Sequence, residues 1–182
     1  MITSRHRAIL AAAVSLLLIA LCLFFFPRLQ GQSKPPLRVT FLDVGQGDAA
    51  VIESPSGRVA VIDGGGRPGT DESLGSDPGS RVVVPYLHSR GISQVDLLIA
   101  THPDDDHIQG LNAVVNRLGV RSALVCGYPG SSAPYHRLLA ALRSRSVPIY
   151  VARRGQRIDL GDGARLEIFS PTDHPLTLNT TP

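Results

Sequence analysis

Most of the groups that could do chemistry lie in ten consecutive residues of this 182-residue chain. Residues 101–110 read Thr-His-Pro-Asp-Asp-Asp-His-Ile-Gln-Gly, which places two imidazoles and three carboxylates within six positions. Both groups are good ligands for zinc and manganese, and adjacent carboxylates repel one another unless a cation lies between them. The pattern therefore favours a site for one or two divalent metal ions. In a second interpretation, Asp105 or Asp106 only caps a following helix and the other residues are solvated.

The elements on either side must position these groups. Residues 95–100 are apolar except for Asp96 and predict a buried strand, and residues 108–118 predict an amphipathic helix. The apolar residues of this helix share one face: Ile108, Leu111, Val115 and Leu118. Ligands of α/β proteins bind at the carboxyl ends of strands, where helices begin. The metal-binding groups are therefore expected at such an edge.

The remaining pattern predicts one α/β layered domain. A composition of 43% hydrophobic and 18% charged residues indicates a folded chain, and the length excludes two full catalytic domains. Residues 64–81 are rich in glycine and lack periodicity, which predicts a long loop of the kind that often binds ligands. Further strands are expected at 37–42, 49–53, 58–62, 123–126, 149–152 and 165–169, and further helices at 82–90 and from Ser132 onward.

Three motifs, in this order, resemble those of the metallo-β-lactamase fold. Residues 43–49 (DVGQGDA) are similar to the segment that opens the hydrolase-like domain of ComEC-like competence proteins, and residues 61–65 (VIDGG) to the strand end before its metal loop. Residues 102–107 resemble the family's HxHxDH loop, with Asp104 at the second His. The resemblance implies an αββα sandwich and a metal-dependent hydrolase, in which metal-activated water attacks a phosphoryl or carbonyl group.

The resemblance also implies roles for the residues of the loop. His102 and Asp104 would bind a first metal ion, and Asp106 and His107 a second. The ions would be divalent, zinc or manganese. Asp106, a ligand that also faces the nucleophile, would orient it and so act as the catalytic residue.

Three other carboxylates would support this loop. Asp63 would orient it through hydrogen bonds, and Asp43 and Asp48 would line the pocket beside it. The family's later metal residues, a bridging Asp and a HHGS-like segment, are not recognisable before Pro182. We therefore expect the domain of residues 37–182 to be incomplete at its C-terminus.

Basic residues gather in one part of the domain. Residues 107–158 carry eight arginines and no acid, and Arg pairs well with phosphate oxygens. Arg153 and Arg154 are the candidates for binding a substrate phosphate. Together with the resemblance to proteins of competence and DNA uptake, the block favours phosphodiesters or DNA, although a solvated face or a contact with anionic lipid explains it as well. Hydrolysis of a small ester, lactone or lactam and a truncated, non-catalytic binding module remain alternatives.

An apolar segment precedes the domain. Residues 8–26 contain no charge and no glycine, and a helix of this length measures roughly 28 Å, close to the thickness of a bilayer core. We predict a membrane anchor at residues 1–29 and a linker at 30–36. Because Arg5 and Arg7 precede the span, the expected location is the cell membrane, crossed once, with the domain outside. A signal peptide is the alternative, and its cleavage would release the domain.

Overall fold

The computed structural model describes residues 4–29, 34–67 and 77–171. Contacts divide the chain into two units, Met1–Lys34 and Pro35–Pro182. The first unit contains helix α1 (Ser4–Leu29). Within the described residues, no helix is both long enough and apolar enough to cross a membrane. The structure thus has a helix where the anchor is predicted but does not bear out the membrane crossing of residues 8–26.

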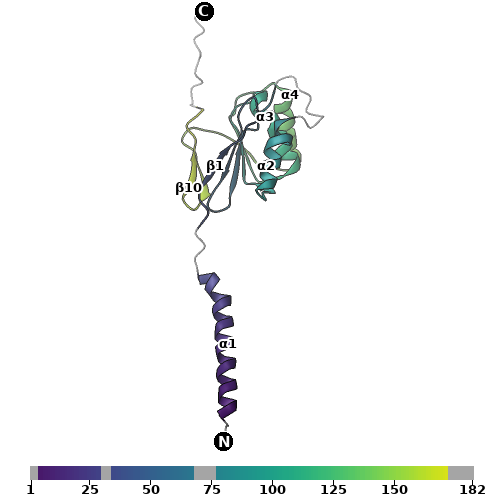
Figure 1. The fold of residues 1–182 in the computed structure, drawn as a ribbon. Coiled ribbons are helices and arrows are strands. Elements are labelled where there is room, and N and C mark those ends of the chain that lie inside the picture. The colour runs from purple at the N-terminus through teal and green to yellow at the C-terminus, as the bar shows by residue number, and fades with distance from the viewer. Residues whose placement is uncertain (1–3, 30–33, 68–76, 172–182) are drawn as a thin grey trace, which may run out of the picture. The chain divides into compact units, whose positions relative to one another are not determined.

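A six-stranded sheet with the order β1-β2-β3-β5-β7-β8 forms the centre of the second unit (Figure 1). The first three strands form an antiparallel meander: β1 (Arg38–Phe41), β2 (Ala50–Glu53) and β3 (Val59–Ile62). The next three run parallel to β3: β5 (Leu97–Ala100), β7 (Ala123–Val125) and β8 (Ile149–Val151). Four parallel strands therefore end at the same edge of the sheet.

Helices cover one face of this sheet (Figure 1). They are η2 (Gly79–Val83), which continues into α2 (Val84–Ser89), followed by α3 (Asp105–Arg117) and α4 (Ala133–Ser144). The main core lies between the helices and the sheet, where alternate strand residues meet the apolar helix faces. Its fully buried side chains include Val51, Val61, Leu98, Leu111 and Leu138.

A hairpin packs against the other face. It consists of β9 (Arg157–Gly161) and β10 (Ala164–Glu167), and buried Leu160 joins the apolar residues of that face. The short strands β4 (Gln94–Val95) and β6 (Gly119–Val120) form a separate parallel pair. Of the αββα sandwich that the resemblance implies, the described residues thus contain one helical layer, the central sheet and a hairpin on its second face.

The predicted elements are present, and their ends differ in informative ways. Helix α3 begins at Asp105, three residues before the predicted start, because carboxylates in the first turn interact favourably with the helix dipole. Helix η2 begins inside the stretch predicted as a loop, residues 64–81, of which 68–76 lie outside the described residues. Strands β6 and β9 are not predicted from the sequence, and β4 overlaps the predicted strand 95–100 only at Val95. Strands of two residues, such as β4 and β6, have no detectable periodicity.

Candidate metal centre

The carboxyl ends of β3 and β5 lie side by side and carry the site. Asp63 follows β3, and Thr101 and His102 follow β5. The Asp63 carboxylate connects the two strand ends, because its Oδ1 accepts the Thr101 backbone N–H at 2.9 Å and its Oδ2 accepts the Thr101 hydroxyl. Asp63 is 2% exposed, so it is held as a buried acceptor at this edge.

Three side chains meet beyond this carboxylate. His102, Asp106 and His107 each offer one ligand atom, and these atoms all lie within 4.8 Å of one another. The two imidazole ring centroids are 3.6 Å apart, and His107 Nε2 is 3.9 Å from Asp106 Oδ2. Two imidazoles and one carboxylate are the protein ligands of many catalytic zinc sites, in which a further position stays open. The donor set therefore fits a divalent cation.

Asp63 also fixes the orientation of His107. His107 Nδ1 lies 2.9 Å from Asp63 Oδ2, and its side chain is 12% exposed. When the neutral ring donates its Nδ1–H to the carboxylate, the lone pair is on Nε2, on the side of Asp106. A carboxylate that holds a histidine in this way raises its basicity as a ligand.

The loop between β1 and β2 packs directly against the metal-binding segment. Gly47 has φ +84°, and a Cβ at this position would lie 1.7 Å from the Asp106 carbonyl oxygen. The segment after β3 is hydrogen-bonded to helix α3, because the Gly64 N–H donates to the His107 carbonyl at 2.8 Å. The two glycine-containing motifs thus let three backbone segments approach closely around Asp106 and His107.

Comparison with known proteins agrees with this geometry. The family model of the metallo-beta-lactamase superfamily matches residues 42–178. The chain belongs to this superfamily. It is 29% identical over 156 residues to ComE operon protein 3 of Bacillus subtilis (strain 168), a match that includes 82% of this chain and 20% of that protein. The chain therefore spans about a fifth of the length of this relative, and the predicted resemblance to ComEC-like members of the superfamily is confirmed.

Two solved structures are similar at lower identity. Rm3 metallo-beta-lactamase matches with 14% identity and a TM-score of 0.45, over 68% of this chain and 45% of its own. A diphosphatase from the PhnP family matches with 17% identity and a TM-score of 0.37, over 68% of this chain and 54% of its own.

The other carboxylates of the superfamily motifs lie outside the group of three. Asp104 is the N-cap of α3, and its carbonyl accepts the N–H groups of His107 and Ile108. Its Oδ2 is 3.6 Å from His102 Nε2, but its side chain is 71% exposed. The structure thus brings together His102 and the pair Asp106 and His107, which the sequence analysis assigns to different ions, and leaves Asp104 at the rim.

Asp43 and Asp48 support the loop rather than the group of three. Asp43 Oδ1 accepts the Gly45 N–H at 3.2 Å, and this residue lines a separate cavity. Asp48 is exposed, and its carbonyl accepts the Gly65 N–H at 2.8 Å. Thr101 belongs to the motif, but the sequence does not predict its role, because nothing in the pattern shows that its hydroxyl and N–H both reach Asp63.

The arginines of the basic block divide between the two ends of the domain. Arg153 and Arg154 are exposed and follow β8, at the edge where β5 also ends. Only β7 separates these two strands, which places β8 about 10 Å from β5. Arg117 and Arg143 instead lie in the last turns of α3 and α4. The block is therefore not one continuous surface. Only part of it lies at the edge that carries His102, Asp106 and His107, which we refer to as the metal-binding group.

A buried tyrosine stands behind the metal-binding loop. Tyr135 of α4 is 6% exposed, and its ring and Pro103 both pack against Gly130. The N-cap of the same helix, Ser132, donates from its hydroxyl to the Pro103 carbonyl at 3.3 Å. Burial raises the pKa of the Tyr135 hydroxyl above its ordinary value. This residue supports the loop from the core side.

Proposed function

We propose that this chain carries the metal-binding half-site of a metal-dependent hydrolase that acts on phosphodiesters, DNA among them. The observation that carries the proposal is the convergence of His102, Asp106 and His107 within 4.8 Å at the carboxyl ends of the strands. Membership of the superfamily adds support, because its members usually bind divalent metals. The activity is therefore expected to depend on these three residues together.

Each residue of the site has a distinct task in this proposal. His102, Asp106 and His107 would hold a divalent cation, zinc or manganese, which lowers the pKa of a coordinated water and polarises the phosphoryl oxygen under attack. Asp106 has two carboxylate oxygens, so one can be a ligand while the other accepts a hydrogen bond from the attacking water. Asp63 keeps the His107 ring in place through its Nδ1.

Positive charge at the same edge supports an anionic substrate. Arg153 and Arg154 are exposed, and the strand before them ends beside β7 and near β5. Guanidinium groups bind phosphate oxygens through paired hydrogen bonds. A substrate with several phosphates could reach these arginines while one of its phosphodiesters lies at the group of three.

The test compares substrates and variants of the full chain with manganese or zinc. Hydrolysis of bis(p-nitrophenyl) phosphate and of single-stranded DNA should be lost in Asp106→Ala. The double variant Arg153→Gln and Arg154→Gln should hydrolyse DNA about tenfold more slowly, with little change for the small diester. Arg143→Gln is the matched control, because this exposed arginine lies at the far end of α4.

Two results would contradict the proposal. Turnover of p-nitrophenyl acetate or of a β-lactam, without turnover of either phosphodiester, would favour the hydrolase of small esters or lactams. Stoichiometric metal binding without turnover of any of these substrates would favour a non-catalytic binding module.

Attachment to the cell membrane through residues 8–26 is a separate proposal from the sequence. Its support is the uncharged, apolar composition of that segment and the preceding Arg5 and Arg7. The full chain, produced in bacteria, should remain in the membrane pellet after extraction with alkaline carbonate. Recovery in the supernatant would contradict the anchor.

A further inference from the structure

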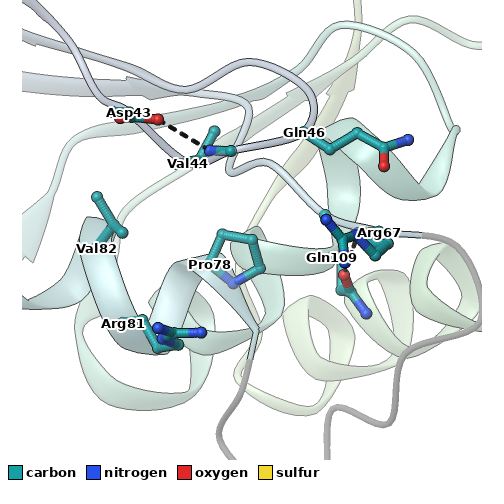
Figure 2. Close-up of a pocket in the computed structure, with 10 residues that line it drawn as sticks. Asp43, Val44, Gln46, Arg67, Pro78, Arg81, Val82 and Gln109 are labelled. Atoms are coloured by element: carbon teal, nitrogen blue, oxygen red, sulfur yellow. Dashed lines mark hydrogen bonds between the residues drawn. The ribbon is translucent and has the colours of Figure 1, made fainter.

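A second feature of the domain is a cavity of about 520 Å³, whose lining residues are drawn in Figure 2. Its walls are the loop after β1, the segment after β3, Pro78 with the start of η2, and the N-terminal part of α3. Its lining includes Asp43, Gln46, Arg67, Arg81 and Gln109. The three residues of the metal-binding group are absent from this lining. The volume is within the range of about 300–1,000 Å³ that is typical of pockets for small ligands.

The charged groups of this cavity are two guanidiniums and one carboxylate, those of Arg67, Arg81 and Asp43. The carboxylate accepts the Gly45 N–H through Asp43 Oδ1, and its single negative charge is outnumbered by the two guanidiniums. Arg81 forms no ion pair with any described residue. By contrast, five arginines elsewhere lie within 3.9 Å of a carboxylate: Arg38, Arg58, Arg90, Arg121 and Arg157. At Arg81, the cavity therefore offers a positive charge that no described carboxylate neutralises through an ion pair.

Buried polar side chains fix the backbone at both arginines. The Arg67 N–H donates to Gln109 Oε1 at 2.7 Å, and Gln109 is 2% exposed. Beside it, Gly66 presses against α3 so closely that a Cβ would lie 2.0 Å from the Asp105 carbonyl oxygen. Figure 2 shows Arg67 next to Gln109, on the other side of the cavity from Arg81. One arginine is thus anchored on α3.

The second arginine is anchored by a different buried residue. Asp77 is 6% exposed, its Oδ1 accepts the Ser80 N–H at 2.8 Å, and its carbonyl accepts the Arg81 N–H at 3.2 Å. These bonds fix the turn from which the Arg81 side chain extends. Because both backbones are held before any ligand arrives, little conformational entropy is lost at these positions on binding.

We propose that this cavity binds a phosphate group between Arg67 and Arg81. Two guanidiniums supply paired N–H donors that match phosphate oxygens, and the carboxamide of Gln46 adds a neutral hydrogen-bonding group at the same cavity. The phosphate could be free or could belong to a nucleic acid strand. This inference goes beyond the proposed hydrolysis, since binding here needs neither the metal ion nor turnover.

The cavity and the metal-binding group nevertheless flank the same loop. Gln46 lines the cavity, and the next residue, Gly47, contacts the backbone of Asp106. A strand whose phosphate occupies the cavity would therefore run close to the metal-binding group. We accordingly expect an oligonucleotide to use both sites, whereas inorganic phosphate can use the cavity alone.

The test is calorimetric titration of the metal-free full chain with inorganic phosphate and, separately, with a short single-stranded oligonucleotide. Both Arg81→Gln and Arg67→Gln should weaken phosphate binding about tenfold. Arg143→Gln, which removes the same charge from the end of α4, should leave it unchanged. Circular dichroism of each variant checks that the fold is kept.

The outcomes separate this inference from the proposed hydrolysis. His107→Ala should abolish metal binding and turnover but leave phosphate binding intact. Oligonucleotide affinity that falls in Arg81→Gln assigns the cavity to phosphates of a nucleic acid, and unchanged oligonucleotide affinity with weakened phosphate binding assigns it to a small anion. The inference is overturned if the metal-free parent chain binds no phosphate, or if both arginine variants bind it as the parent does.

Discussion

The two ends of the parallel strands carry similar groups in opposite arrangements. At the amino end, Asp96 Oδ1 lies 3.4 Å from Arg121 Nε, and Asp96 Oδ2 accepts the Val59 N–H at 2.8 Å. At the carboxyl end, Asp106 lies with His102 and His107 in a group that offers three metal ligands. At the amino end, Asp96 thus has its partners within the protein. At the carboxyl end, Asp106 lies beside two imidazoles with which it could share a cation.

A cavity alone does not distinguish these two ends. The amino end has one of about 410 Å³, lined by Arg58, Asp96 and Arg121 among others. There, Arg58 and Arg121 each have a carboxylate partner, Asp159 and Asp96 respectively. The cavity beside Arg81 has a similar size but keeps a guanidinium without such a partner among the described residues. The two ends therefore differ in whether their arginines are paired with carboxylates, and not in whether they have a cavity. We expect ligands to bind at the carboxyl end.

The largest expected effect is that of the metal ion on stability. At a free concentration of about 100 times its Kd, zinc or manganese should raise the free energy of unfolding by about 2.7 kcal/mol. His107→Ala should abolish this gain, because it removes one of three ligands. His136→Ala is the control, since this histidine is exposed on α4. Urea unfolding with and without metal measures the difference. An equal gain in the parent chain, His107→Ala and His136→Ala would contradict a metal site at the carboxyl end.

Weakening the carboxylate behind His107 should have the next largest effect. In Asp63→Asn the side chain keeps one oxygen, so it can no longer accept the Thr101 N–H, the Thr101 hydroxyl and His107 Nδ1 together, as the two carboxylate oxygens do. Metal affinity should fall about 10- to 100-fold, the usual effect of losing such a partner of a ligand. Competition with a fluorescent chelator measures this affinity. An unchanged affinity would show that Asp63 serves only the fold.

The amino end should respond in the opposite way. Asp96→Ala leaves the Val59 N–H without its acceptor and removes the partner of Arg121. The free energy of unfolding should fall by about 1–3 kcal/mol, mostly from the unsatisfied N–H. Metal affinity should stay as in the parent chain. A loss of metal binding in a folded Asp96→Ala variant would contradict the separation of the two ends.

The smallest expected effect is that of Tyr135 on stability at alkaline pH. This residue lies near the carboxyl end of the strands but is buried in the core. Because burial raises its pKa, the unfolded chain loses this proton at a lower pH than the folded chain. Its contribution to stability is therefore full below the ordinary tyrosine value of about 10 and decreases as the pH rises above it. Tyr135→Phe should remove part of the alkaline loss of stability, measured by urea unfolding at pH 9 and pH 11. An identical loss in both proteins would contradict this role.

The strands of the central sheet, the helices and the candidate metal loop could be predicted because each has a local pattern. Periodicity predicts α3, and the order of residues 102–107 predicts the candidate ligands just before it and in its first turn. The position of Asp104 could not be predicted in the same way. It occupies a ligand position of the motif, but α3 begins directly after it, so its backbone caps the helix and its side chain stays at the surface.

The phosphate-binding cavity has no local pattern at all. Arg67 and Arg81 are separated by 14 positions in a stretch without periodicity. They line one cavity because buried Gln109 and Asp77 fix the backbone at each of them. Neither polar residue stands out in the sequence, since a buried role for Gln or Asp depends on tertiary contacts. Such a site becomes visible only when the chain is folded.

The most direct test of the account is the metal content of the purified full chain. Elemental analysis should find close to one equivalent of zinc or manganese in the parent chain and in His136→Ala. The same analysis should find almost none in His102→Ala and Asp106→Ala, because each lacks one of the three converging ligands. A parent chain that binds no metal, or variants that keep it, would contradict the claim that the carboxyl end of the sheet is a metal centre.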